Sequence, residues 1–450
     1  MTGSPWRIAV VGAGPSGVYA ASEILKQSSR TTVDLIDRLP TMGGLARAGV
    51  APDHHARRNV IEFYERLILA SGRFRFYGNI EIGLDVLPVD LARLYDAVVY
   101  AYGCRGDRRL GIPGEELPGS HSATNFVGWY NGHPDHRQHE FDFDCERAVV
   151  IGNGNVALDI ARVLLLGAGE LSKTDIADHA LDALSRSRVR EVVLVGRRGL
   201  QECSFTTPEL VELNHLELDI SVENAGFPTR STDVDACGFA NDLKCRLLAD
   251  LAARPRRGKA RMVLRFLTSP IEILGDDKVR AIGLTGNRLV VKNGRTVAEP
   301  NGEVQQLDTG LVFRSIGYAA EPLAGLPFDS TRAIVPNVAG RVTRSDSKVV
   351  ERAYVTGWIK RGPRGVIGSN KLCARETVAT LLHDLRSDTT LRTNTGETLM
   401  SFVGEKAKSV VDYAGWKRID QFERRAAAGT ARPRVKLTQW TALHDVSCGI

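Results

Sequence analysis

Short apolar runs rich in β-branched residues alternate along the chain with longer stretches of helical periodicity. Most runs lead through a glycine-containing turn into an amphipathic segment, so we interpret them as strands that precede helices. Strands that alternate with helices are typical of parallel sheets, and the α/β fold class is therefore expected. In the tail, apolar periodicity from Val410 to Phe422 predicts a further helix. The predicted strands lie at 8–11, 33–36, 96–103, 148–151, 192–195, 310–318 and 351–357.

Two of these strand–helix junctions carry a glycine pattern. The first reads GAGPSG, with Gly12, Gly14 and Gly17, and the second reads GNGNVA at 152–157. In this pattern the first glycine permits the tight turn, the second lets the backbone approach a pyrophosphate, and the third lets the helix pack on the strand; alanine is tolerated there. The helix N-terminus then offers free N–H groups to the anion. Two such patterns predict two Rossmann-like domains that exchange electrons or hydride between two nucleotides.

The residues that follow each second strand predict different nucleotides. Asp37 lies 20 residues beyond Gly17, where a carboxylate accepts ribose hydroxyls and repels a 2′-phosphate. At the second site Arg197 and Arg198 follow the strand at 192–195. Because guanidinium groups suit bidentate phosphate binding, we interpret this site as an NADP site. The alternative is a pair of surface arginines at a strand end.

The second fingerprint lies inside the sequence of the first domain. The chain has 450 residues, which is too long for one ordinary core, so two or three domains are expected. We predict a discontinuous first domain over 1–105 and 319–450, with the second domain nested at 106–318. An insertion around 167–190 lengthens the crossover of the nested domain.

Composition excludes several classes of protein. Apolar residues make up 43% of the chain and charged residues 25%, as in soluble globular proteins. No apolar run reaches the length of about 18 residues that spans a bilayer. The short polar start enters a strand directly and does not resemble a signal-peptide core, so we expect a cytoplasmic protein. Seven scattered cysteines without a CxxC pair argue against a disulfide framework, an iron–sulfur cluster and a redox-active disulfide, and no metal site is expected.

Positive charge is concentrated in one stretch, although the net charge is only +6. Between 251 and 271 there are six basic residues and no acidic one. A patch of one sign can steer an acidic partner, whereas the alternative is a solvated helix end and loop. Nucleic acid is not expected, because no aromatic residues interleave with the charges. The six are Arg254, Arg256, Arg257, Lys259, Arg261 and Arg265.

Longer strings of residues resemble the adrenodoxin reductase-like family of ferredoxin–NADP reductases. The resemblance runs from Val10 to about Leu385, and the tail beyond is similar only loosely. One departure is Asp37, where family members often carry the longer Glu. The strings are GVAPDH at 49–54, FVGWYNG at 126–132, GNVALDIAR at 154–162 and GWIKRGPRGVI at 357–367.

The resemblance implies a flavoprotein with FAD in the first domain and NADPH in the nested one. Hydride would pass from nicotinamide C4 to flavin N5, and two single electrons would then pass to an iron–sulfur ferredoxin that can feed a cytochrome P450. The implied FAD contacts are Ser16, Asp37, Leu45 and Ile82, with Trp358, Gly365, Val366 and Ile367 beside the isoalloxazine ring. The implied NADP contacts are Asn153, Gly154, Asn155, Val156, Arg197, Arg198 and Glu209.

Two further sets of residues acquire roles through the resemblance. His54, on a predicted loop, and Glu209 are the catalytic candidates: they could orient the nicotinamide carboxamide or handle the proton that accompanies flavin reduction. The alternatives are a structural loop histidine and a surface helix acid. The basic stretch matches the region that receives an acidic ferredoxin, and the docking candidates are Arg254, Arg256, Arg257 and Lys259.

Three other functions stay open at this point. An NADPH-dependent flavin monooxygenase or oxidase would carry an FxGxxxHxxxY/F signature between the fingerprints, which this chain lacks. The flavin subunit of a larger complex, as in glutamate synthase, would carry N-terminal cysteines for clusters, and the first cysteine here is Cys104. A nucleotide-sensing interaction protein would bind flavin that NADPH does not bleach.

Overall fold

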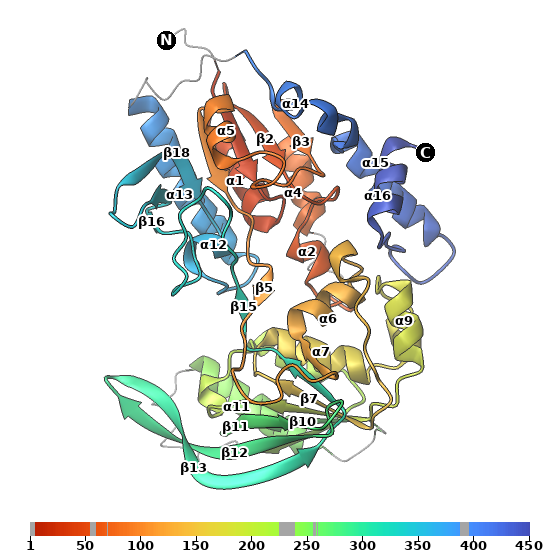
Figure 1. Ribbon diagram of the computed structural model, residues 1–450. Coiled ribbons are helices and arrows are strands. Elements are labelled where there is room, and N and C mark those ends of the chain that lie inside the picture. The colour runs from red at the N-terminus through yellow and green to blue at the C-terminus, as the bar shows by residue number, and fades with distance from the viewer. Residues whose placement is uncertain are drawn as a thin grey trace. The chain divides into compact units, whose positions relative to one another are not determined.

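The computed structural model (Figure 1) describes residues 5–54, 60–69, 71–224, 239–254, 258, 260–387 and 396–450. The chain forms two compact units. Unit 1 comprises 1–106, 131–137 and 318–450, and unit 2 comprises 107–130 and 138–317. Among the described residues, no helix combines the length and the apolar character needed to cross a membrane.

Unit 1 is built on a seven-stranded sheet in the order β16-β17-β18-β4-β1-β2-β3. Its central strands are parallel, and β16 and β17 form an antiparallel edge. The strands are β1 (Arg7–Val11), β2 (Thr32–Ile36), β3 (Phe74–Tyr77), β4 (Ala97–Tyr100), β16 (Asn337–Val338), β17 (Arg341–Thr343) and β18 (Val349–Val355). A separate two-stranded sheet pairs β5 (Gly106–Asp107) with β15 (Tyr318–Ala319).

Both faces of this sheet are buried, as parallel sheets require. Ile8 and Val10 of β1 pack on one face with residues of α1, α13 and α15, whereas Ala9 and Val11 pack on the other with residues of α5, α12 and α14. The unit 1 helices are α1 (Pro15–Gln27), α2 (Leu45–Ala48), α4 (Val60–Leu69), α5 (Pro88–Leu94), η1 (Pro134–His136), α12 (Trp358–Arg361), α13 (Ser369–Ser387), α14 (Leu399–Phe402), η5 (Gly404–Ser409), α15 (Tyr413–Ala426) and α16 (Trp440–Cys448).

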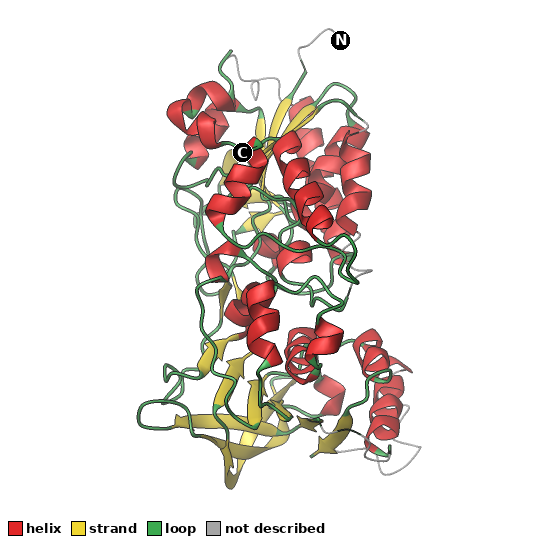
Figure 2. Cartoon of the chain, turned by 90° about the vertical axis from the view of Figure 1, so that its right-hand side faces the viewer, coloured by secondary structure: helices red, strands yellow, loops and turns green. Residues whose placement is uncertain are grey.

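Unit 2 contains a six-stranded sheet in the order β6-β14-β7-β8-β10-β9, all of whose pairs are parallel. Alternate residues of β7 again face two cores. Ala148 and Val150 pack against helices, whereas Val149 and Ile151 pack against a three-stranded antiparallel sheet, β11-β12-β13. The long strands of this second sheet are seen at full length in Figure 1, and Figure 2 distinguishes the strands from the helices by colour.

The strands of unit 2 are β6 (Ser120–Ser122), β7 (Arg147–Ile151), β8 (Glu191–Val195), β9 (Asp219–Glu223), β10 (Arg261–Arg265), β11 (Thr268–Leu274), β12 (Ala281–Lys292), β13 (Arg295–Asp308) and β14 (Leu311–Arg314). Its helices are α6 (Ala123–Tyr130), α7 (Asn155–Leu165), α8 (Ala168–Leu171), α9 (Asp178–Ser185), η2 (Leu200–Glu202), α10 (Thr207–Leu213) and α11 (Phe239–Ala252).

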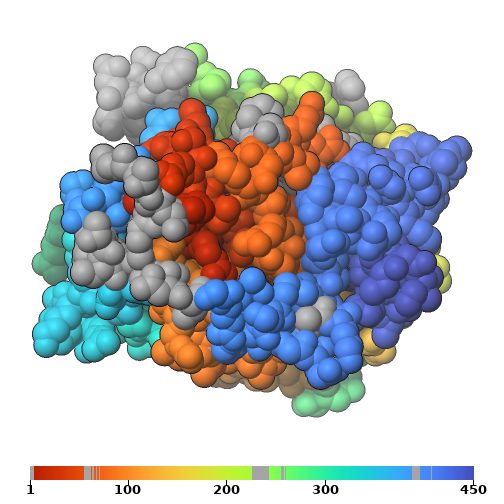
Figure 3. Space-filling view, turned by 90° about the horizontal axis from the view of Figure 1, so that it is seen from above, coloured from red at the N-terminus to blue at the C-terminus, as the bar shows by residue number. Residues whose placement is uncertain are grey.

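The α/β class with two Rossmann-like units is confirmed, and several element boundaries differ from the prediction. The strands expected at 96–103 and 351–357 are β4 and β18, which end at Tyr100 and Val355. The strand expected at 310–318 ends at Arg314, and Gly317, with φ of +112°, separates it from β15. The tail helix begins at Tyr413 because Asp412 caps it, accepting a hydrogen bond from the N–H of Gly415 at 2.7 Å. In Figure 3 the blue carboxy-terminal residues lie beside the red and orange amino-terminal residues of the same unit.

Candidate functional site

The first fingerprint loop connects β1 to α1 in a geometry that only glycines permit. Gly12 has φ of +107°, and a Cβ there would lie 2.6 Å from the carbonyl oxygen of Ala101. A Cβ on Gly17 would lie 1.8 Å from the oxygen of Gly12. Gly14 is less crowded, since a Cβ there would make only an ordinary contact with the Cα of Gly44 at 3.8 Å. No side chain caps the helix at Gly14, so its first N–H groups are available to an anion.

The carboxylate of Asp37 lies against this loop. It accepts hydrogen bonds from the backbone N–H of Ala13 at 2.5 Å and of Leu39 at 2.8 Å. Burial raises the pKa of the Asp37 carboxyl above its ordinary value, and the two N–H donors oppose that shift. Each carboxylate oxygen still has a lone pair for a ribose hydroxyl, as the position predicts.

Of the predicted isoalloxazine contacts, Trp358 begins α12 after the turn from β18, and Gly365, Val366 and Ile367 lie in the loop between α12 and α13. A Cβ on Gly357 would be 2.2 Å from Oγ of Ser16, so this turn touches the start of α1. The indole N–H of Trp358 is buried and has no hydrogen-bond partner among the described residues. Val366 leaves 58% of its surface exposed, although it is apolar. An unused donor and an exposed apolar side chain fit a planar heterocycle that has a polar and an apolar edge.

The other predicted flavin residues are placed differently. Leu45 is the first residue of α2, and the preceding turn touches the fingerprint loop through a hydrogen bond from Gly43 N–H to the carbonyl of Ala13 at 2.9 Å. Ile367 packs at the edge of the α1–α13 core, and Gly365, with φ of +85°, is exposed. The side chain of Ile82 is buried in the core on the opposite face of the sheet.

The second fingerprint in unit 2 repeats the geometry of the first. Gly152 has φ of +135°, and a Cβ there would lie 2.1 Å from the carbonyl oxygen of Ser315. Gly154 is less crowded, since a Cβ there would make only an ordinary contact with the Cβ of Ser204 at 3.9 Å. The helix α7 begins at Asn155 without a side-chain cap. The loop therefore fits a second pyrophosphate.

The two arginines predicted to bind a 2′-phosphate follow β8. Arg197 is exposed, and Arg198 is half-buried. The buried Nε of Arg198 has no hydrogen-bond partner among the residues that the structure describes. A guanidinium with an unused donor fits an anionic group, because a phosphate oxygen would satisfy it.

Glu209 is fully buried at the start of α10, so the alternative of a surface acid is wrong. Its carboxylate is paired with Arg162 at 3.4 Å, and Arg162 also contacts Asp159 at 2.9 Å. The loop before α10 is tied to the fingerprint. The N–H of Thr206 donates to Oδ1 of Asn155 at 2.8 Å, and the N–H groups of Ser204 and Phe205 donate to the carbonyl of Asn153 at 3.0 and 3.1 Å.

His54 lies in unit 1 on the loop that follows α2, as predicted. It is buried, and its backbone N–H closes a turn on the carbonyl of Ala51 at 3.1 Å.

The basic stretch provides less free charge than the sequence suggested. Arg261 and Arg265 lie on β10, where they pair with Glu191 at 3.0 Å and Glu223 at 2.7 Å. The side chain of Arg254 donates to the carbonyl and the side-chain amide of Asn214. The other docking candidates, Arg256, Arg257 and Lys259, lie outside the described residues.

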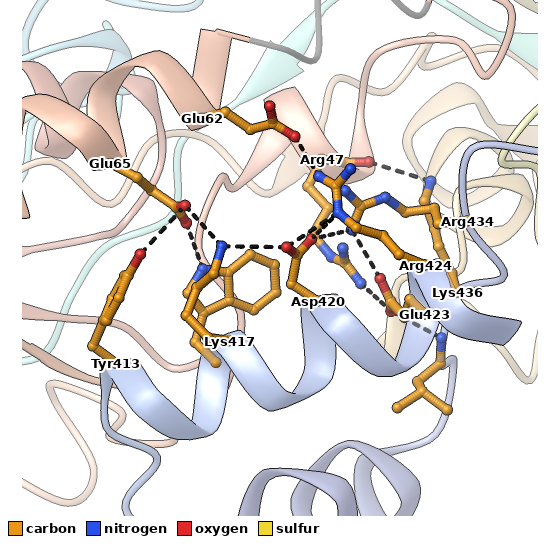
Figure 4. A network of polar contacts seen from close by, with 12 residues as sticks. Arg47, Glu62, Glu65, Tyr413, Lys417, Asp420, Glu423, Arg424, Arg434 and Lys436 are labelled. Atoms are coloured by element: carbon orange, nitrogen blue, oxygen red, sulfur yellow. Dashed lines mark hydrogen bonds and ion pairs between the residues drawn. The ribbon is translucent and has the colours of Figure 1, made fainter. Parts of the chain in front are cut away.

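A polar network that sequence reasoning missed supports α2 from the tail (Figure 4). Glu423 of α15 is 0% exposed and accepts hydrogen bonds from Arg47 of α2, from Arg434 at 3.1 Å and from the N–H of Leu437 at 3.0 Å. Glu65 of α4 accepts a hydrogen bond from the indole N–H of Trp416 at 2.6 Å. The tail thus fixes the helix that carries Leu45 beside the first fingerprint.

Comparison with known proteins agrees with this geometry. A family model for pyridine nucleotide-disulphide oxidoreductases matches residues 6–199. NADPH-ferredoxin reductase FprA of Mycobacterium tuberculosis is 45% identical over 466 residues, covering 99% of this chain and 100% of that protein. The mitochondrial NADPH:adrenodoxin oxidoreductase of Arabidopsis thaliana is 37% identical over 458 residues, covering 98% and 95%. A structure of Mycobacterium tuberculosis FprA in complex with NADPH matches with a TM-score of 0.93 at 44% identity, covering 99% of this chain and all of that one.

Proposed function

Because this chain belongs to the family of NADPH-ferredoxin reductases and NADPH:adrenodoxin oxidoreductases, we propose that it takes electrons from NADPH and delivers them through FAD to an iron–sulfur ferredoxin. FAD, when bound, supplies the conversion from a two-electron hydride donor to a one-electron acceptor. The observation that carries the proposal is the contrast between the fingerprints. A carboxylate, Asp37, accompanies the loop in unit 1, whereas Arg197 and Arg198 accompany the loop in unit 2.

We assign FAD to residues 1–105 and 319–450 and NADP to residues 106–318. The compact units support this assignment, because each contains one fingerprint and the boundaries near 106 and 318 agree with it. The short segment 131–137 packs with unit 1 although it lies within the nested range. The Gly12–Gly17 loop and Asp37 would hold the adenosine diphosphate part of FAD. The N–H of Trp358 would donate to the flavin ring, and Val366 would cover its apolar edge.

NADPH would be held by the loop from Asn153 to Val156 and by the arginines after β8. The exposed side chain of Arg197 and the unsatisfied Nε of Arg198 would receive the 2′-phosphate. Hydride transfer needs two rings in contact with the nicotinamide oriented, and it needs no strong general base. We therefore assign orientation of the carboxamide, or handling of the accompanying proton, to His54 and Glu209.

The acceptor is proposed to be an acidic ferredoxin. The support is the surplus of basic residues near 254–259, although Arg261 and Arg265 are paired within the sheet. Steering by such a patch raises the association rate and weakens as salt shortens the Debye length. Charge reversal at Arg256 and Arg257 should therefore slow reduction of ferredoxin more at low salt than at high salt. A cytoplasmic location is proposed as well, and subcellular fractionation tests it.

The function is tested by NADPH-driven cytochrome c reduction on the flavin-loaded protein, with and without added ferredoxin. We expect that ferredoxin greatly stimulates cytochrome c reduction, whereas direct reduction of ferricyanide does not require it. Stimulation should be lost in the charge-reversed variant while the ferricyanide rate is kept. Failure of NADPH to bleach the bound flavin would contradict the proposed function. Stimulation that survives charge reversal would contradict only the docking surface.

A further inference from the structure

We propose that Asn287 is a positioning residue for selectivity between NADPH and NADH, because its side-chain amide fixes the backbone that carries Arg197 and Arg198. Asn287 lies on β12, in the antiparallel sheet of unit 2, and is 90 positions from Arg197 in sequence. The inference rests on the proposed NADPH-dependent function and names a residue outside the nucleotide motifs.

The loop that carries the two arginines is held by backbone contacts to the turn between β10 and β11. The N–H of Gly196 donates to the carbonyl of Arg265 at 2.8 Å, and the carbonyl of Gly196 accepts from the N–H of Thr268 at 3.0 Å. The carbonyl of Arg198 accepts from the N–H of Leu267 at 3.1 Å. These contacts hold the peptide before Arg197 and the peptide after Arg198, but not the peptide between the two arginines.

The carbonyl of Arg197 is held by a side chain. Nδ2 of Asn287 donates to it at 2.9 Å and also donates to Oγ of Ser269 at 2.8 Å. The backbone N–H of Asn287 donates to the carbonyl of Leu267 at 2.7 Å. Asn287 therefore holds both the loop that carries Arg197 and Arg198 and the turn between β10 and β11 that supports this loop.

Asn287 is itself held rigidly. Asn287 is only 7% exposed. A β-bulge lies between Thr285 and Asn287 on β12. A bulge changes the direction of the side chains beside it. Here it lies next to Asn287, whose side-chain amide reaches the loop that carries Arg197. Leu267, the residue that contacts both Arg198 and Asn287, has φ of +47°, which is rare for a non-glycine residue and persists only where its surroundings enforce it.

Loss of the Asn287 amide should affect binding of the 2′-phosphate and not of the rest of the cofactor. If the amide is lost, the peptide that follows Arg197 can rotate, and both arginine side chains leave from a displaced backbone. A bidentate contact to phosphate depends on the position of the guanidinium fork, so it should weaken. The pyrophosphate loop is held by other backbone bonds, from the N–H of Gly152 to the carbonyl of Val195 at 2.9 Å and from the N–H of Ser204 to the carbonyl of Asn153 at 3.0 Å, and should be unaffected.

The test is the variant Asn287→Leu, which keeps the volume and removes the donors. Its matched control is Asn301→Leu, the same change at an exposed residue of the same hairpin. Binding of adenosine 2′,5′-bisphosphate and of 5′-AMP is measured by calorimetry on the FAD-loaded protein, because these ligands differ only in the 2′-phosphate. Loss of one well-oriented hydrogen bond predicts roughly fivefold to tenfold weaker binding of the bisphosphate. Binding of 5′-AMP should stay within about twofold on the same scale.

Kinetics provide the second readout. In Asn287→Leu the KM for NADPH should rise with kcat unchanged, and kcat/KM for NADH should be kept. Equal losses for both ligands, or no loss, would overturn the inference. If Asn287→Leu does not fold, Asn287→Ser, which keeps one hydroxyl donor, is compared with Asn301→Ser in the same way. A wild-type protein that does not prefer the bisphosphate over 5′-AMP would instead contradict the NADPH site itself.

Discussion

Replacing Arg162 with Met should strongly destabilise unit 2. The Arg162 side chain is 1% exposed and lies between the carboxylates of Glu209, at 3.4 Å, and Asp159, at 2.9 Å. Methionine fills a similar volume but leaves two buried carboxylates without this cation. Removing one partner of a buried ion pair typically costs about 3–5 kcal/mol, so we expect a loss of about 4 kcal/mol in the free energy of unfolding at pH 7.

The assay is urea unfolding followed by circular dichroism, on Arg162→Met, Glu209→Gln and the double variant. The double variant should recover a large part of the loss, because the neutral amide removes the charge that Arg162 offsets. The control is Arg186→Met, which breaks an exposed pair with Asp182 on α9 and should change stability little. An Arg162→Met protein as stable as the wild type, or a double variant no more stable than Arg162→Met alone, would refute the reasoning.

Three further outcomes are expected. Arg197→Ala should weaken NADPH binding about tenfold or more, because a charge-assisted phosphate contact is worth roughly 1.5–3 kcal/mol, and equal losses for NADPH and NADH would show a structural role. Burial beside Arg314 lowers the pKa of His121 to about 4 from 6.5. The unfolded state thus binds a proton that the folded state refuses, and stability is lost as the pH falls from 6.5 toward 4. The free energy of unfolding, measured at pH 7 and pH 4, should fall by about 3 kcal/mol less in His121→Gln than in the wild type. An equal fall in the two proteins would contradict this prediction. Glu423→Gln should lower the free energy of unfolding of unit 1 by about 3 kcal/mol and speed release of FAD. Glu405→Gln, which changes an exposed pair with Lys408, should do neither. Equal behaviour of the two variants would show that the tail network does not support α2 and the first fingerprint loop.

Local sequence was enough to locate the parts of the site that depend on neighbouring residues. The β-branched runs at 8–11 and 148–151 form β1 and β7, and the glycines after them have the turns that the fingerprint predicts. The positions of Asp37 and Arg197 after their second strands followed from the same motif. The start of the tail helix was predicted three residues too early, because the pattern of apolar residues does not show which residue caps the helix. Asp412 is the cap.

Residues that act through distant contacts could not be predicted in this way. Glu423 meets Arg47 across 376 positions, and Asn287 reaches Arg197 across 90. The three-stranded sheet was also missed, although Asn293 and Gly294 form the kind of turn that joins hairpin strands. Glu209 was assigned through family resemblance, and its burial with Arg162 follows only from the packing of α7 and α10.

The most direct test of the central claim is an anaerobic titration of ferredoxin with NADPH in the presence of catalytic amounts of the FAD-loaded protein. If electrons pass from a hydride donor through FAD to a one-electron carrier, each NADPH consumed should reduce two molecules of a ferredoxin that carries one iron–sulfur cluster, and the absorbance of the cluster follows the reaction. NADH at the same concentration should support a much slower reaction. Bleaching of the flavin by NADPH while the ferredoxin stays oxidised would contradict the account.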